Sequence, residues 1–138
     1  MEKYILKDSK TGYSKIYDNN VKNSQKIITE YNVIYTNKKL DYAILNVKIP
    51  TGKTHQIRAQ LSAISHPIIG DSKYGNNAIN KKFNTYKQLL YAYKYTFSFN
   101  KDSLFYYLNS KTIKLDKSIY LINIGDSNEQ EKRGRTKT

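Results

Sequence analysis

The sequence of 138 residues contains no cysteine, which excludes disulfide bonds and cysteine-based zinc sites. Its two histidines, His55 and His66, are too few for a histidine-rich metal site. No apolar run approaches the ~20 residues that a membrane-spanning helix needs. Residues 1–8 lack the apolar core and the cleavage site of a signal peptide. We therefore expect one soluble domain in a reducing compartment, the cytoplasm.

Acidic residues are scarce, with 11 Asp and Glu against 24 Lys and Arg, so the formal net charge is +13. Such an excess favours polyanionic partners, because lysines contact phosphates and release counterions from nucleic acid. An AT-rich genome would also load a protein with Lys, Asn, Ile and Tyr, all of which are frequent in this chain. The charge thus favours a nucleic acid as partner, and codon bias remains the alternative.

Arginine is rarer than the charge suggests, since only three of the 24 basic residues are Arg. Two of them, Arg133 and Arg135, lie near the C-terminus, which leaves Arg58 as the only arginine before them. A guanidinium is permanently charged and planar, and it can bind a carboxylate through two parallel hydrogen bonds. We interpret Arg58 as a residue with a task that lysine cannot perform, with chance as the alternative.

Short segments rich in β-branched and aromatic residues predict an antiparallel sheet. Alternation over residues 42–49 predicts a half-buried strand, and residues 26–36 are expected to pair with it as a hairpin. Further strands are predicted at residues 4–6, 13–17, 89–99, 104–108 and 112–115, with residues 118–124 as a strand or a short helix.

One central helix is predicted over residues 54–65, where Ile57, Leu61 and Ile64 recur on one face. The candidates for capping its start are Thr51 and Thr54. These elements together indicate an α+β fold, mainly antiparallel sheet with a central helix.

The segments after the helix are expected to be loops. Residues 66–75 contain Gly70, which permits a tight turn or a positive φ. Residues 76–84 are polar and rich in asparagine, which is typical of a surface loop. Residues 127–138 are charged and without pattern, so we expect a disordered tail.

Two other functional hypotheses are disfavoured because the motifs that they require are missing. Gly52, Lys53 and Thr54 resemble the end of a phosphate-binding loop, but that loop needs a glycine where Val47 stands. A hydrolase built on His55 would need a positioned nucleophile, and no G-x-S-x-G motif is present. A histidine at a helix start is more often a structural residue.

The stretch TGKTHQIR at residues 51–58, followed by HPIIGDSKYG at residues 66–75, resembles the third signature of the RluA-type RNA pseudouridine synthases. The flanking segments IITEY and LLYAYKYTFSF fit the same pattern, and the likeness runs from about residue 4 to residue 124. The resemblance implies the pseudouridine synthase fold and isomerisation of uridine in ribosomal or transfer RNA, without a metal or a cofactor.

The resemblance also implies roles for single residues. Arg58 would be the catalytic arginine that pairs with the family's nucleophilic aspartate. Apart from the resemblance, residues at the helix start are expected to hold substrate or RNA, because a helix start can hold phosphate, and residues of the following loop are expected to shape that loop, with local packing and capping as the alternative for both groups. The first group is Lys53, Thr54, His55 and Gln56, and the second is His66, Gly70, Asp71 and Tyr74.

The sequence departs from the family in one decisive respect. The family's nucleophile lies in a motif like H-R-L-D followed by T-S-G, and no aspartate here has that context. The family's active-site tyrosine has no evident counterpart, and Tyr91 replaces the usual histidine of an L-H-A motif. We therefore expect residues 1–126 to be the C-terminal portion of a catalytic domain, inactive alone. The alternative is a non-catalytic basic RNA-binding module.

The missing nucleophile has a consequence for Arg58. Without its partner, this side chain is expected to be partly exposed or held by a substitute. A backbone carbonyl, an ordered anion or another chain would serve as that substitute.

Overall fold

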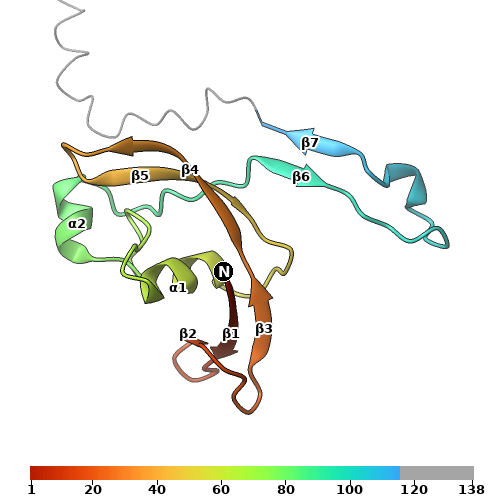
Figure 1. Ribbon diagram of the computed structural model, residues 1–138, viewed down its shortest axis with the longest axis horizontal. Coiled ribbons are helices and arrows are strands. Elements are labelled where there is room, and N and C mark those ends of the chain that lie inside the picture. The colour runs from red at the N-terminus through yellow and green to blue at the C-terminus, as the bar shows by residue number, and fades with distance from the viewer. Residues whose placement is uncertain (116–138) are drawn as a thin grey trace, which may run out of the picture. The chain divides into compact units, whose positions relative to one another are not determined.

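The computed structural model describes residues 1–115, in which the chain forms two compact units that divide between Gln88 and Leu89. These residues contain two α-helices and seven strands, which are labelled in Figure 1. All strand pairs among them are antiparallel, which confirms the predicted α+β class. The strand or short helix predicted at residues 118–124 and the disordered tail predicted at residues 127–138 lie outside the described residues.

The first sheet contains β1 (Glu2–Lys7), β2 (Ser14–Tyr17) and β3 (Gln25–Ile28) in the order β2-β1-β3. In the centre of β1, Tyr4 lies opposite Tyr17 of β2 and Lys26 of β3. The strands predicted at residues 4–6 and 13–17 are therefore confirmed, with slightly different ends.

The strand predicted over residues 26–36 is two strands, β3 and β4 (Glu30–Asn37), which divide at Thr29. At this residue the chain changes its pairing partner from β1 to β5 (Tyr42–Lys48). Thr29 is fully buried, and its hydroxyl donates a hydrogen bond to the side chain of Gln60. A continuous β propensity cannot reveal this division, because the contacts that fix Thr29 come from distant residues.

The predicted hairpin is formed by β4 and β5, which make a two-stranded sheet of their own. Its register is irregular between Val33 and Tyr35, where one strand carries a bulge. Such a bulge changes which side chains share a face beyond that point.

The central helix α1 (Gln56–Ala63) is confirmed, but its start and its buried face differ from expectation. His55 precedes it with φ 58° and no side-chain cap, so capping by Thr51 or Thr54 is wrong. The hydroxyl of Thr51 instead accepts the backbone N–H of Ile28 at 2.9 Å.

The buried face of α1 is largely polar. Leu61 is buried as expected, but Ile64 is 37% exposed while Gln56 and Gln60 are buried. Gln56 and Gln60 occupy the buried face because their side-chain amides hydrogen-bond with Thr29. The spacing of apolar residues alone therefore gives the wrong centre for the buried face.

Residues predicted as a surface loop form a second helix, α2 (Asn77–Lys82). The side chain of Asn76 caps it by accepting the backbone N–H groups of Ala78 and Ile79. Asparagine is a strong N-cap residue, so a composition typical of loops here supplies the start of a helix.

The second unit contains β6 (Lys94–Thr96), the 3₁₀ helix η1 (Tyr106–Leu108) and β7 (Thr112–Lys114). The strand predicted at residues 89–99 is thus only three residues long, because β7 offers a partner of the same length. The prediction of a strand at residues 104–108 is wrong, since that segment contains η1. No helix within residues 1–115 is long and apolar enough to cross a membrane.

Candidate active site around Arg58

Arg58 of α1 and Asp71 of the following loop form a bidentate ion pair. The Arg58 Nε donates to Asp71 Oδ2 at 2.7 Å, and its Nη2 donates to Asp71 Oδ1 at 2.8 Å. The Asp71 side chain is fully buried and that of Arg58 is 17% exposed. Two parallel, charge-assisted hydrogen bonds fix both the distance and the plane of the guanidinium.

The loop around Asp71 is held by its own hydrogen bonds. Asp71 Oδ1 also accepts the backbone N–H groups of Lys73 at 2.8 Å and Tyr74 at 2.9 Å. Asn80 of α2 donates to the carbonyl of Asp71 and accepts the N–H of Gly70. Gly70 has φ +81°, a conformation that favours glycine. These hydrogen bonds position the carboxylate of Asp71 independently of Arg58.

Both members of the pair are charged at neutral pH. Burial raises the pKa of Asp71, but the hydrogen bonds from Arg58 and from the backbone of Tyr74 and Lys73 outweigh it and lower the pKa to about 2. The hydrogen bond to Asp71 raises the pKa of Arg58. The pair is thus a stable ionic feature of the site rather than a proton donor or acceptor.

Tyr74 connects this loop to α1 and β2. Its ring lies 5.2 Å from the guanidinium carbon of Arg58, and its hydroxyl accepts the N–H of Ser14 at 2.7 Å. His55 Nδ1 lies 3.0 Å from the same hydroxyl, and Ser62 donates to the Tyr74 carbonyl. Burial, followed by the charges of Arg58 and Lys73, lowers the pKa of His55 and favours the neutral imidazole.

Among the predicted RNA-binding residues, Lys53 and Thr54 are exposed and His55 is half-buried. Gln56 is only 2% exposed, and its Nε2 donates to the Ile28 carbonyl and the Thr29 hydroxyl. The expectation that Gln56 contacts RNA does not agree with this burial, and its hydrogen bonds make it a structural residue.

The predicted loop residues lie together in part. Asp71, Tyr74 and Gly70 form the hydrogen-bonded loop, whereas the side chain of His66 is exposed and its backbone N–H closes the end of α1 on Leu61.

The Arg58 side chain is only 17% exposed, and its partner differs from every substitute proposed from the sequence. A carboxylate of the same chain, Asp71, takes that place. The two hydrogen bonds use Nε and Nη2. Nη1 has no hydrogen-bond partner within residues 1–115, so one edge of the guanidinium remains available.

Sequence reasoning missed four buried polar residues that support the site. Thr29 donates a hydrogen bond to Gln60 on the buried face of α1. The hydroxyl of Ser14 donates to the Thr54 carbonyl, and the side chain of Asn80 donates to the Asp71 carbonyl in the loop. The four-residue spacing of Gln56 and Gln60 was the one available signal, because it places two amides on one helix face. Gln60 Nε2 is buried without a hydrogen-bond partner among the described residues.

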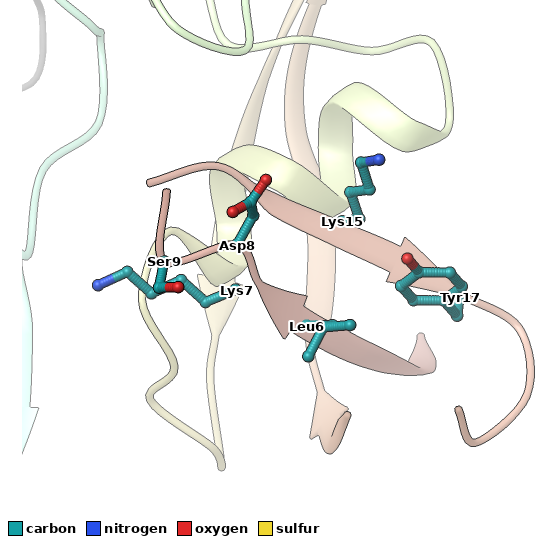
Figure 2. A pocket seen from close by; sticks show the side chains of 6 residues that line it. All are labelled: Leu6, Lys7, Asp8, Ser9, Lys15 and Tyr17. Carbon is teal, nitrogen blue, oxygen red and sulfur yellow. The ribbon is translucent and has the colours of Figure 1, made fainter. Parts of the chain in front are cut away.

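A hollow of about 320 Å³ lies on the β1–β2 hairpin, and none of its lining residues is among those predicted for the site. Figure 2 shows Asp8 at this hollow; its carboxylate accepts the backbone N–H of Lys10 at 2.8 Å and shapes the turn. The six lining residues are Leu6, Lys7, Asp8, Ser9, Lys15 and Tyr17. Within residues 1–115, no group of three or more His, Asp or Glu side chains is arranged to hold a metal ion.

Comparison with known proteins identifies the segment that carries Arg58. The family described as RNA pseudouridylate synthase matches residues 1–63, from β1 to the end of α1. An uncharacterized RNA pseudouridine synthase of Aquifex aeolicus is 44% identical over 54 residues, which are 39% of this chain and 17% of that protein. Residues 1–63 of the chain therefore match the RNA pseudouridine synthase family. The likeness to the RluA type is consistent with this match.

Two further pseudouridine synthases extend the similarity. One of Mycoplasma genitalium, also uncharacterized, is 32% identical over 117 residues, which are 83% of this chain and 36% of that protein. Ribosomal large subunit pseudouridine synthase D of Buchnera aphidicola is 34% identical over 79 residues, covering 49% of this chain and 24% of that protein. The chain thus matches between about a sixth and about a third of these pseudouridine synthases' length. No solved structure matches the chain.

Proposed function

We propose that this chain supplies one part of the active site of an RNA pseudouridine synthase that isomerises uridine in ribosomal or transfer RNA. The observation that carries the proposal is the fixed guanidinium of Arg58, which lies in the segment matched by the family and keeps one edge unused. The name of the Buchnera relative favours ribosomal RNA as the substrate.

Arg58 would act on an aspartate that this chain does not contain in a recognisable motif. In the reaction that the resemblance implies, this aspartate attacks the uridine nucleotide, and the base detaches, rotates and rejoins through its carbon 5. A guanidinium has five N–H groups in one plane, so it can bind two carboxylates along different edges. Asp71 occupies the Nε and Nη2 edge, which leaves the Nη1 edge for the nucleophile. Bound there, the nucleophile is kept ionised and oriented.

Asp71 would be a positioning residue rather than a catalytic one. It is fully buried, so it does not reach substrate, and its bidentate contact prevents rotation of the guanidinium. The backbone N–H groups of Lys73 and Tyr74 hold the carboxylate in turn. A side chain fixed by a second layer of hydrogen bonds delivers its charge without reorganisation during the reaction.

RNA binding would precede this chemistry, since the target nucleotide must leave the base stack to reach the site. The exposed Lys53 and Thr54 lie beside the start of α1 and are available to contact phosphates. The net charge of +13 supplies long-range attraction to the RNA backbone.

The second candidate is a non-catalytic basic RNA-binding module. The absence of an H-R-L-D motif from the sequence favours it, together with the high positive charge. It differs from the first proposal in one measurable way, because joining the chain to the missing part of a synthase would then yield no product.

The test compares the chain alone with a fusion. The part of the Mycoplasma relative that precedes its matching segment is fused to residue 1, and pseudouridine is measured by mass spectrometry after incubation with ribosomal and transfer RNA. We expect product from the fusion and none from the chain alone, because the chain contributes Arg58 but no nucleophile. An inactive but folded fusion that still binds RNA would favour the module. Turnover by the chain alone, lost on changing one of its own aspartates, would contradict its expected inactivity.

A further inference from the structure

The β1–β2 hairpin turns one of its faces to the rest of its unit. Ile5 of β1 lies opposite Ile16 of β2, and Ile5 is only 4% exposed. Ser14 shares this face with Ile16, because side chains two residues apart in a strand point to the same side. Its hydroxyl donates to the carbonyl of Thr54, which lies just before α1. We call this the inner face of the hairpin.

The hollow on this hairpin lies on the opposite, outer face. Leu6 lies opposite Lys15, and both line the hollow together with Tyr17, which follows Lys15 by two residues. Asp8 lines it from the turn that follows β1. Figure 2 shows the ammonium of Lys7 extending away from Lys15 and Tyr17, so Lys7 contributes no charge to this arrangement. The hollow thus combines an aromatic ring, a cation and a carboxylate.

Lys15 has no ionic partner within residues 1–115. Its side chain is exposed and forms no ion pair there, whereas Lys3 of the same hairpin is paired with Asp18. A protein surface that closed over the hollow would remove the Lys15 ammonium from water without a counter-charge, which is costly. A phosphate supplies that charge. The hollow therefore favours a polyanion over an apolar protein surface.

Asp8 is fixed by the turn that it begins. Its N–H donates to the Tyr13 carbonyl at 2.8 Å, and its carbonyl accepts the N–H of Gly12 at 2.8 Å. The carboxylate accepts the backbone N–H of Lys10, and Thr11 contacts it through its backbone and its side chain. These hydrogen bonds lower the pKa of Asp8, so the carboxylate is ionised at neutral pH. Because a carboxylate offers about four acceptor positions, it can still accept a donor from a ligand.

We propose that this hollow binds one unpaired ribonucleotide of a bound RNA. The proposal rests on RNA as the partner in the proposed function, and it assigns a subsite that does not include Arg58. The base stacks on the ring of Tyr17, the phosphate contacts the ammonium of Lys15, and the ribose 2′-hydroxyl donates to Asp8. Lys15 and Tyr17 are separated by about 7 Å along β2, so one nucleotide can reach both.

The chemistry of the three groups assigns each of them to one part of the nucleotide. Every base has a flat face that stacks on an aromatic ring, whatever the sequence. An ionised carboxylate only accepts hydrogen bonds, so Asp8 repels a phosphate and fits a hydroxyl group. Acidic side chains bind ribose hydroxyls in this way in dinucleotide sites. Since the 2′-hydroxyl is what distinguishes RNA from DNA, Asp8 gives the hollow a preference for RNA.

The first test measures this preference with the intact chain. Fluorescence anisotropy gives the affinity for an oligouridylate of about eight nucleotides and for its 2′-deoxy counterpart, which differ only in the 2′-hydroxyl. We expect the RNA to bind at least about fivefold more tightly, because a hydrogen bond to a charged acceptor is stronger than one to a neutral acceptor. Asp8→Asn keeps an oxygen for the turn but removes the charge, so it should reduce the preference to less than about twofold.

The second test compares two pairs of matched variants. Lys15→Gln is compared with Lys10→Gln, at an exposed lysine of the adjacent turn that does not line the hollow. Only Lys15→Gln should lower the slope of log affinity against log salt by about one, since it removes a phosphate contact. Tyr17→Leu should weaken binding of both probes at least about fivefold, and Tyr86→Leu, at a 68% exposed tyrosine outside the hollow, less than about twofold.

A third measurement does not depend on a variant. In the complex of the wild-type chain with the oligouridylate, we expect nuclear Overhauser effects between the uracil ring protons and the ring protons of Tyr17. This result holds even where Tyr17→Leu lowers folding stability, which circular dichroism melting reports.

Several outcomes would overturn the proposal. These are no binding of the oligouridylate at low salt, equal salt slopes for the two lysine variants, and no contact between uracil and Tyr17 in the complex. Equal affinity for the RNA and the DNA probe would overturn the ribose contact of Asp8. Uridine monophosphate that binds as tightly as the oligouridylate would assign the hollow to free nucleotides instead.

The failure of this proposal is distinguishable from the failure of the proposed function. An active fusion whose RNA affinity does not depend on Lys15 or Tyr17 refutes the subsite alone. Binding that depends on both residues, together with an inactive fusion, refutes the catalytic function alone.

Discussion

Arg58 and Asp71 lie 13 residues apart in the chain and meet through two hydrogen bonds of 2.7 and 2.8 Å. One residue belongs to α1 and the other to the loop that follows it, so the pair fastens the loop onto the helix. The Asp71 side chain is fully buried and that of Arg58 is only 17% exposed. Water therefore cannot replace either charged group as the partner of the other. The pair therefore links the stability of the fold to the orientation of the residue proposed for catalysis.

Asp71→Asn is expected to lower the free energy of unfolding by about 3 kcal/mol, because it leaves the largely buried Arg58 without a counter-charge. Urea unfolding followed by circular dichroism measures this difference. The matched control is Ser72→Ala at the neighbouring exposed position, which should change the free energy by less than about 0.5 kcal/mol. Equal unfolding midpoints for the two variants would show that the ion pair does not stabilise the loop.

Stability is expected to fall with acidification between about pH 4 and pH 2. The folded state lowers the pKa of Asp71 from 3.8 to about 2, so the unfolded chain takes up a proton first as the pH falls. The contribution is fully present above the unfolded value and amounts to about 2 kcal/mol, which is lost as the pH approaches the folded value. Urea titrations at several pH values test this, and Asp71→Asn should show a flatter dependence over the same range. A slope unchanged by that substitution would assign the effect to other carboxylates.

Gly70→Ala is expected to destabilise the fold by more than about 2 kcal/mol, through the left-handed backbone and a steric clash. Gly70 has φ +81°, and a Cβ there would lie 2.0 Å from the carbonyl oxygen of Lys87. Gly52→Ala serves as the control, since a Cβ at Gly52 would meet nothing within 4 Å. Thermal melting of both variants compares the two positions, and a similar melting temperature for both would contradict the rigid loop described here.

Arg58→Lys in the active fusion is expected to reduce turnover by about a hundredfold, comparable to losing one oriented hydrogen-bond donor in the transition state. Lysine keeps the charge but cannot bind Asp71 and a second carboxylate along two fixed edges. Single-turnover kinetics on ribosomal RNA measures the chemical step, with Lys81→Arg at an exposed position of α2 as the control. Unchanged turnover of Arg58→Lys would remove Arg58 from the mechanism.

RNA affinity of the chain is expected to fall at least about tenfold between 50 mM and 200 mM salt, since phosphate contacts release counterions. The binding should depend little on RNA sequence, because lysine contacts to phosphates carry no base information. Fluorescence anisotropy with two unrelated structured RNAs measures both properties. Absence of binding at low salt would leave codon bias as the explanation of the net charge.

The local sequence was sufficient for most elements of the fold. Alternation over residues 42–49 predicted β5, and the apolar spacing after Gly52 predicted α1, because both depend on which side chains recur at the period of one element. The same reasoning was wrong for residues 76–84, where the Asn76 cap starts a helix, and for residues 104–108, where a 3₁₀ helix replaces a strand. Local sequence also predicted a single strand where the structure has β3 and β4, because the change of pairing partner at Thr29 depends on distant residues.

For the site, the sequence determined that Arg58 is the exceptional cation and that the segment around it matches the pseudouridine synthase family. Only the tertiary structure decided that Asp71 is the partner of Arg58 and that Gln56, the first residue of α1, is buried. The physical reason is the range of the interactions. Propensity, capping and motif spacing act within a few residues along the chain, whereas an ion pair between a helix and a loop depends on where folding brings the two side chains together in space.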